Sequence, residues 1–231
     1  MSPTPLVEPQ ADAERLALDR AVAEAVRLRL AAGPRPSPDA DAIALRDLLK
    51  DLPPAASAAA RAVLGRIDAA SGAPLVVWGP ASQTLAADRF GLTARTAAEP
   101  EQALAAVREG SRALLDLTPG RAWWGRLLAE PALRVIAALP DDRHGLPRAL
   151  LVQRMDPGPT GDDRTFWATD SQAPDARIIE ILGAAGLAAS SLIAAGGLKL
   201  FMLAGYVQAE DGRLASAPGG LSGVIGAAPL F

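Results

Sequence analysis

Apolar residues recur with helical spacing over the first part of the chain. Leu18, Val22, Val26 and Leu30 follow one another at every fourth position, which is typical of one face of an α-helix. The sequence Gly33-Pro34-Arg35-Pro36 ends this helix, because proline cannot continue it. A second helix is predicted from a Ser37 or Asp39 cap to about Leu52, and a third over 55–71. The second helix is expected to bury Ile43, Leu45, Leu48 and Leu49.

The pattern changes at Pro74, where short apolar runs begin to alternate with helical segments. Runs with strand character are predicted at 75–78, 92–97, 113–117, 133–139, 149–153 and 164–169. Helices are predicted over about 82–90, 100–109 and 123–130. Strands that alternate with helices at this spacing favour an α/β layer with a largely parallel sheet.

The last sixty residues have a different order of elements. A helix is predicted over 174–185, followed by strands at 188–194, 198–204 and near Val224, which makes a small βαββ-like α+β module. The chain is therefore predicted to be an α+β multidomain protein. Its parts are a disordered lead-in at 1–10, a helical unit at 11–73, an α/β unit at 74–170 and the α+β module at 171–231.

Composition and charge exclude several classes of function. The formal net charge is −3, so the chain has no general attraction for nucleic acid or for an anionic membrane surface. It has no cysteine and only one histidine, His144, which leaves almost no material for a metal site or a Ser-His-Asp triad. No apolar run is long enough to span a membrane, and the first fifteen residues do not have the pattern of a secretory signal. We expect a cytoplasmic protein without metal or cofactor.

The order of the units resembles the chorismate mutase–prephenate dehydratase family, in particular a short alphaproteobacterial form. The stretches that carry the resemblance are LALDRAVAEAVRLRL (16–30), LPPAASAAARAVLGRIDAASGAPLVVWGP (52–80), WWGRLLAEPALRVIAALP (123–140) and GPTGDDRTF (158–166). The resemblance implies a helical chorismate-mutase-like domain, a reduced prephenate-dehydratase-like α/β domain and an ACT-like module. It also implies a homodimer that takes a small carboxylate ligand: chorismate, prephenate or an aromatic amino acid.

The resemblance implies a catalytic set that this chain keeps only in part. The chorismate-to-prephenate rearrangement needs no cofactor, only cations placed around the substrate carboxylates and the ether oxygen. Arg29 matches one arginine of that set, and Asp41 keeps the acid of an Arg-Glu pair whose cation is replaced by Ala40. An arginine in the last turn of a helix also favours the helix dipole, which is the alternative role for Arg29. The chain is either a weak chorismate mutase, an isomerase and not a dehydratase, or a non-catalytic binding or regulatory pseudoenzyme. A structural interaction protein with no small-molecule site is the third alternative.

Two further motifs suggest ligand-binding residues by the same resemblance. Gly79-Pro80 leads into a helix with Ser82 and Thr84, where free N–H groups can accept a carboxylate; an ordinary turn with Ser82 as cap is the alternative. Leu115-Asp116-Leu117 stands at the family's Glu-Asn-Ser motif, and Arg164-Thr165-Phe166 at its Thr-Arg-Phe motif, so Thr165 joins the candidates. Trp123 and Trp124 are expected to fill the interface between sheet and helices, with pocket lining as the alternative.

Overall fold

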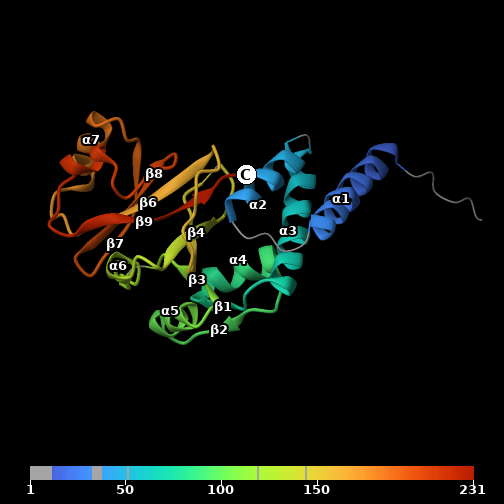
Figure 1. Ribbon diagram of the computed structural model, residues 1–231, viewed down its shortest axis with the longest axis horizontal. Coiled ribbons are helices and arrows are strands. Elements are labelled where there is room, and N and C mark those ends of the chain that lie inside the picture. The colour runs from blue at the N-terminus through green and yellow to red at the C-terminus, as the bar shows by residue number, and fades with distance from the viewer. Residues whose placement is uncertain (1–11, 33–37, 51, 119, 144) are drawn as a thin grey trace, which may run out of the picture.

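The computed structural model describes residues 12–32, 38–50, 52–118, 120–143 and 145–231 (Figure 1). Its helices are α1 (Ala13–Ala32), α2 (Pro38–Leu49), α3 (Pro54–Ser71), α4 (Pro80–Phe90), α5 (Pro100–Arg108), α6 (Gly125–Ala129) and α7 (Asp175–Ala184), with a 3₁₀ turn η1 (Gly212–Ser216). Its strands are β1 (Leu75–Trp78), β2 (Arg95–Thr96), β3 (Arg112–Asp116), β4 (Arg134–Leu139), β5 (Ala149–Gln153), β6 (Asp163–Thr169), β7 (Ala189–Ala195), β8 (Leu198–Ala204) and β9 (Ser222–Pro229). The mixed α/β character predicted from the sequence is confirmed within these ranges.

All the strands of the described residues belong to one nine-stranded sheet, in the order β2-β1-β3-β5-β4-β9-β6-β8-β7. One apolar cluster continues along a face of this sheet, from Val76 and Leu115 in its first half to Phe166 and Leu200 in its second. Trp123 and Trp124 are buried in that cluster, as expected of residues between sheet and helices.

The prediction of a largely parallel sheet is wrong beyond the first strands. β1 is parallel to both β2 and β3, but β5 runs antiparallel to β3 and to β4. The physical reason is the length of the connection between β4 and β5. β4 ends at Leu139 and β5 begins at Ala149, a separation that can join antiparallel neighbours but is too short for the crossover that parallel strands need.

The strands β2, β1 and β3 have helices on both faces. The connection from β1 to β2 contains α4, whose Ala86 and Phe90 pack with Val77 on one face. The connection from β2 to β3 contains α5, whose Leu104 packs with Val76 on the other face. The carboxyl ends of β1 and β3 are neighbours in the sheet, but the connection after β1 leads to β2 on one side and the connection after β3 leads to β4 on the other.

The second half of the sheet has the order β9-β6-β8-β7, with antiparallel pairs throughout. Helix α7 covers one face, where Ile178 and Leu182 pack on Trp167 and Phe201. Backbone hydrogen bonds join residues on both sides of the boundary predicted near residue 170. β6 precedes this boundary in the sequence, and its two partners in the sheet, β8 and β9, follow it. β9 in turn pairs with β4, so the halves form a continuous sheet.

The helical unit joins the sheet through arginines. Asp141, in the turn after β4, accepts hydrogen bonds from Arg61 of α3 at 2.5 Å and from Arg89 of α4 at 3.2 Å. Arg46 of α2 donates to backbone oxygens at Thr160, Asp162 and Leu230 and lies over the Phe231 ring. The C-terminus consequently lies next to α2 (Figure 1).

Packing in the first two helices differs from the predicted stripes. Ile43 is 50% exposed and Leu30 is 61% exposed, and Ala25, which is outside the predicted stripe, is buried. The prediction that Ile43 is buried is therefore wrong. Leu49 is buried, as predicted. Within the described residues, α1 has substantial contact with α3 and with no other element. One neighbouring helix cannot cover the whole apolar stripe of α1, so part of that stripe is exposed. No helix within the described residues is long and apolar enough to cross a membrane.

Candidate functional site

A cavity of about 500 Å³ lies at the carboxyl ends of β1 and β3. The start of α4 contributes Pro80, Ala81 and Thr84, and the end of β3 and the residues after it contribute Asp116 and Thr118. Its remaining walls are Leu85, Leu117, Pro147, Arg148 and Leu192. Ligands of open α/β sheets bind in the crevice where neighbouring strands lead to opposite sides, and this cavity occupies that position.

Asp116 is the central polar residue of the cavity wall. It ends β3, is 2% exposed, and its side chain faces the start of α4. Its carboxylate accepts hydrogen bonds from the Ala81 N–H at 3.0 Å, from the Ser82 N–H, and from the Thr118 hydroxyl at 3.4 Å. A carboxylate at this place accepts hydrogen bonds from amides that have no partner within the helix, and it interacts favourably with the positive end of the helix dipole.

Gly79 allows Asp116 to come this close. Its φ is +92°, in the region that side chains with a Cβ rarely adopt. A Cβ at this position would also collide with the Asp116 carboxylate. Glycine is therefore needed here for backbone conformation and for the close approach of the acid.

The amides proposed from the sequence to hold a ligand carboxylate thus donate to the protein's own acid. Ser82 is fully buried, and its hydroxyl has no hydrogen-bond partner. Thr84 is exposed on the cavity wall, where its hydroxyl donates to the Pro80 carbonyl at 3.2 Å. Gly79, Ser82 and Thr84 are brought together at this site, whereas the role of Asp116 was not predicted. The signal for it was an acid that interrupts the apolar run 113–117.

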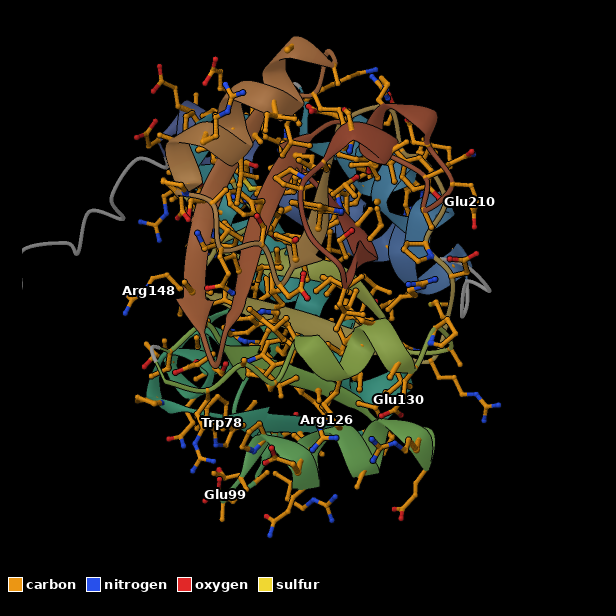
Figure 2. The ribbon with its side chains drawn as sticks, turned by 90° about the vertical axis from the view of Figure 1, so that its left-hand side faces the viewer. Trp78, Glu99, Arg126, Glu130, Arg148 and Glu210 are labelled. Atoms are coloured by element: carbon orange, nitrogen blue, oxygen red, sulfur yellow. The ribbon has the colours of Figure 1, made fainter. Side chains whose placement is uncertain are left out.

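Arg148 supplies a positive charge at the rim of the cavity. Its backbone precedes β5, whose Ala149 lies opposite Asp116, and its carbonyl accepts the Leu117 N–H at 2.8 Å. The side chain is exposed and extends outward from the body of the protein (Figure 2). Among the described residues it forms no ion pair, so the guanidinium is available to a ligand.

Thr165, the remaining predicted ligand-binding residue, lies elsewhere in the fold. It is fully buried on β6, where its hydroxyl donates to the Gly205 carbonyl at 2.8 Å. The same oxygen accepts the Val207 N–H at 2.8 Å. Both hydrogen-bonding capacities connect β6 to the segment after β8, and the structure does not bring Thr165 together with Gly79, Ser82 and Thr84.

The two predicted catalytic residues belong to helices of the first unit. Arg29 is in α1 and Asp41 in α2, but their side chains lie outside the part of the chain that the structure describes. His144 also lies outside it. Within the described ranges, no cluster of three or more acidic, histidine or cysteine side chains has the arrangement of a metal site.

Comparison with known proteins gives two similar structures. No family model matches the chain, and no curated protein matches it. One similar structure is described as "GqqA- a novel type of quorum quenching acylases", with a TM-score of 0.44, 18% identity, and coverage of 68% of this chain and 95% of that one. The other is a prephenate dehydratase in complex with L-Phe from Arthrobacter aurescens, with a TM-score of 0.39, 14% identity, and coverage of 68% and 89% respectively.

Proposed function

We propose that the chain is a non-catalytic binding protein for an aromatic amino acid or a similar small carboxylate, held in the cavity at the ends of β1 and β3. The observation that carries the proposal is the pair of opposite charges on this cavity, Asp116 in its wall and Arg148 at its rim. An α-amino acid carries the matching pair, an ammonium and a carboxylate, on one carbon atom. The ligand class is the one that the sequence resemblance implies.

Asp116 has the capacity to accept a ligand ammonium. A carboxylate has about four acceptor positions. The Ala81 and Ser82 amides and the Thr118 hydroxyl use three of them. The ligand carboxylate then binds Arg148, because the helix amides are occupied by Asp116. An arginine matches a carboxylate with two parallel N–H donors.

The apolar walls suit the side chain of an aromatic amino acid. Leu85, Leu117 and Leu192 approach the cavity from α4, from the end of β3 and from β7. Pro80 and Pro147 complete an apolar surface around the charged groups. A mostly apolar pocket with a few polar groups that fix the orientation is the usual form of a small-molecule site.

Chorismate rearrangement is the alternative function, and it stays a prediction. It depends on Arg29 and Asp41, with the helical unit as the active domain and no metal or cofactor. In this alternative, prephenate forms from chorismate at a rate that Arg29→Ala abolishes. In the binding protein, chorismate is not consumed above the uncatalysed rate.

We also propose a homodimer formed through α1. Leu16, Leu28 and Leu30 are 40%, 41% and 61% exposed on this helix. Leu16 and Leu30 are fourteen positions, or about four turns, apart and therefore lie on one face of α1, and we propose that a second copy of the chain covers this face. Sedimentation of the wild type as a dimer, and of Leu30→Glu as a monomer, would support it; a monomeric wild type would contradict it.

Isothermal titration calorimetry with L-phenylalanine tests the binding function. The wild type is expected to bind, and Arg148→Ala is expected to bind at least tenfold more weakly, since a charge-assisted pair contributes roughly 1.5–3 kcal/mol. Arg126→Ala is the matched control, because Arg126 is also an exposed arginine, lies on α6 and does not line the cavity; Figure 2 shows it apart from Arg148.

The ligand derivatives separate the two charges. L-Phenylalaninamide lacks the carboxylate and N-acetyl-L-phenylalanine lacks the ammonium, so each is expected to bind more weakly than the amino acid. Equal affinity of wild type and Arg148→Ala for L-phenylalanine would contradict the proposed role of the cavity. If none of the three compounds gives heat of binding, the proposed ligand class is contradicted.

A further inference from the structure

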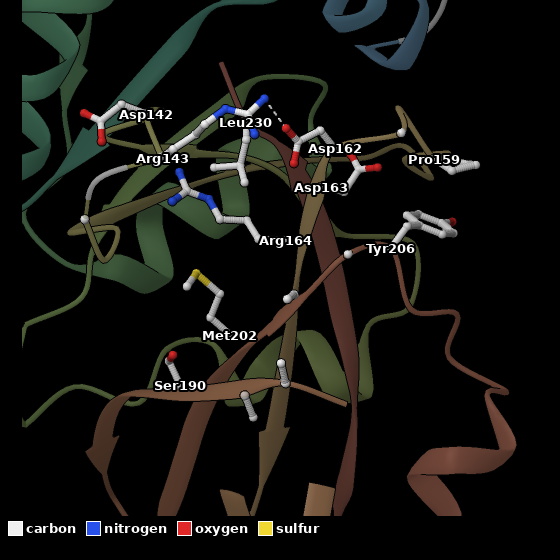
Figure 3. A pocket seen from close by; sticks show the side chains of 16 residues that line it. Asp142, Arg143, Pro159, Asp162, Asp163, Arg164, Ser190, Met202, Tyr206 and Leu230 are labelled. Carbon is white, nitrogen blue, oxygen red and sulfur yellow. Dashed lines mark ion pairs between the residues drawn. The ribbon is translucent and has the colours of Figure 1, made fainter. Parts of the chain in front are cut away.

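A second cavity, of about 390 Å³, lies in the second half of the sheet, where β6 and β7 begin and β8 ends. The starts of β6 and β7 and the end of β8 form its floor, and its rim includes Asp142, Arg143, Gly145 and the loop 159–162 (Figure 3). Met202 and Ser190 are partners across β8 and β7, and Phe166 pairs with Met202, so these side chains share one face of the sheet. That face is opposite to the one covered by α7, where Trp167 and Phe201 are buried.

Arg164 is the buried cation of this cavity. It is 2% exposed, and one of its terminal nitrogens donates to the carbonyls of Ala138 at 2.9 Å and Pro140 at 2.6 Å. Its Nε has no hydrogen-bond partner, and no carboxylate among the described residues forms an ion pair with it. Burial lowers the pKa of Arg164, while the charges of Asp141 and Asp142 oppose that shift from a distance.

The other charged groups that line the cavity, which are Asp142, Arg143, Asp162 and Asp163, have partners within the protein. Arg143 forms an ion pair with Asp162, which Figure 3 marks with a dashed line. The Asp163 carboxylate accepts the Thr160 N–H at 2.8 Å and the Thr160 hydroxyl at 2.6 Å. The charges of Asp141 and Asp142 act on Arg164 without a direct ion pair, and a buried charge that no counter-charge contacts is costly. Arg164 is therefore the group on this wall that a ligand would compensate.

We propose that this cavity is a second ligand site, which takes a small organic anion with its acidic group toward Arg164 and its apolar part against Met202 and Ala204. Carboxylates and phosphate monoesters share this chemistry. The site is separate from the cavity at β1 and β3 and uses none of its residues.

The rim connects this second cavity to the helical unit. Arg46 of α2 donates to the Thr160 carbonyl at 2.7 Å, to the Asp162 carbonyl at 3.0 Å and to the Leu230 carbonyl at 3.1 Å. Asp162 and Leu230 both line the cavity. A ligand that orders this rim is thus expected to stabilise the contact between α2 and the C-terminal strand as well.

Calorimetric titration with 3-phenylpropanoate and phenyl phosphate tests the proposal, with neutral 3-phenylpropanamide as the uncharged probe. At least one anion is expected to bind tenfold or more tightly than the amide. Arg164→Gln is expected to remove that preference, and Arg164→Lys, which keeps the charge, to restore part of it. If the anions and the amide bind with equal affinity, or no probe binds, the proposal is overturned.

A cavity-filling variant tests the site independently of Arg164, in case the Arg164 variants do not fold. Ala204 is exposed on the cavity wall, so Ala204→Phe fills the space without removing a hydrogen-bonding side chain. Ala184→Phe places the same side chain at an exposed position at the end of α7 and is the matched control. Ala204→Phe is expected to abolish anion binding, and Ala184→Phe to leave it unchanged. Unchanged binding in Ala204→Phe would overturn the site.

Arg148→Ala separates this proposal from the proposed amino-acid site. It is expected to leave the affinity for the preferred anion unchanged, although it weakens L-phenylalanine binding. Loss of anion binding in Arg148→Ala would place the anion in the cavity at β1 and β3, and would overturn a separate site at Arg164.

Discussion

Replacing Asp116 by alanine removes the acceptor from two backbone N–H groups at the start of α4, those of Ala81 and Ser82. The Ser82 amide is buried, so water cannot freely take the place of the carboxylate. A hydrogen bond to a charged group contributes roughly 1.5–3 kcal/mol, and two bonds at the lower bound give about 3 kcal/mol. Asp116→Asn keeps one acceptor oxygen and loses the charge at the helix N-terminus, so we expect a loss of about 1 to 1.5 kcal/mol.

Urea unfolding followed by circular dichroism measures this loss. With a slope of about 3 kcal/mol per M, Asp116→Ala is expected to lower the urea midpoint by about 1 M. Asp88→Ala is the control, because Asp88 is exposed on the same helix and a surface substitution of this kind changes stability by about 0.5 kcal/mol or less. If Asp116→Ala unfolds at the wild-type midpoint, the carboxylate does not cap α4 and the account of this site is wrong.

Gly79→Ala is expected to destabilise the protein by about 2 kcal/mol or more, because it strains a positive φ and displaces the neighbouring acid; a urea midpoint within error of the wild type would contradict this. Arg46→Ala is expected to accelerate hydrogen exchange of the Leu230 amide, since the arginine holds that segment against α2; unchanged exchange would show that the contact is unimportant. In an NMR titration the Asp211 carboxyl is expected to have a pKa of about 2, lowered from 3.8 by the hydrogen bond from the Arg213 side chain. Because this pKa is depressed in the folded state, the contribution of the pair is complete above about pH 4 and is lost as the pH falls through about 2. Arg213→Ala is expected to return the Asp211 pKa toward 3.8; an unchanged midpoint would assign the shift to another cause.

The hydrophobic pattern predicted the elements well where local sequence determines them. The apolar runs at 113–117 and 149–153 correspond to β3 and β5, and the proline-initiated helix predicted over 174–185 corresponds to α7. Direction and pairing were harder to predict, because they depend on contacts between distant residues. The pairing of β9 with β4 joins residues about ninety positions apart, and no local pattern encodes it.

The sequence indicated the Gly-Pro turn but not the acid that faces it. The Gly-Pro turn located the start of α4, but the acid that occupies its amides comes from β3, more than thirty residues later. For Thr165, the sequence suggested a functional role where the structure shows a structural one. Its motif suggested a ligand contact, and its hydroxyl instead joins β6 to the segment at Gly205 and Val207. A hydroxyl in a strand can serve either purpose, and only the fold decides which partner reaches it.

Mapping the contact surface of L-phenylalanine by NMR chemical shifts tests the central claim most directly. If the amino acid binds at the carboxyl ends of β1 and β3, the largest shift changes are expected at the Ala81, Ser82, Leu117 and Thr118 amides, and Arg148→Ala is expected to need at least tenfold more ligand to reach them. Saturable shift changes confined to α1 and α2, or an absence of shift changes up to the solubility limit of L-phenylalanine, would contradict a binding site at the carboxyl ends of these strands.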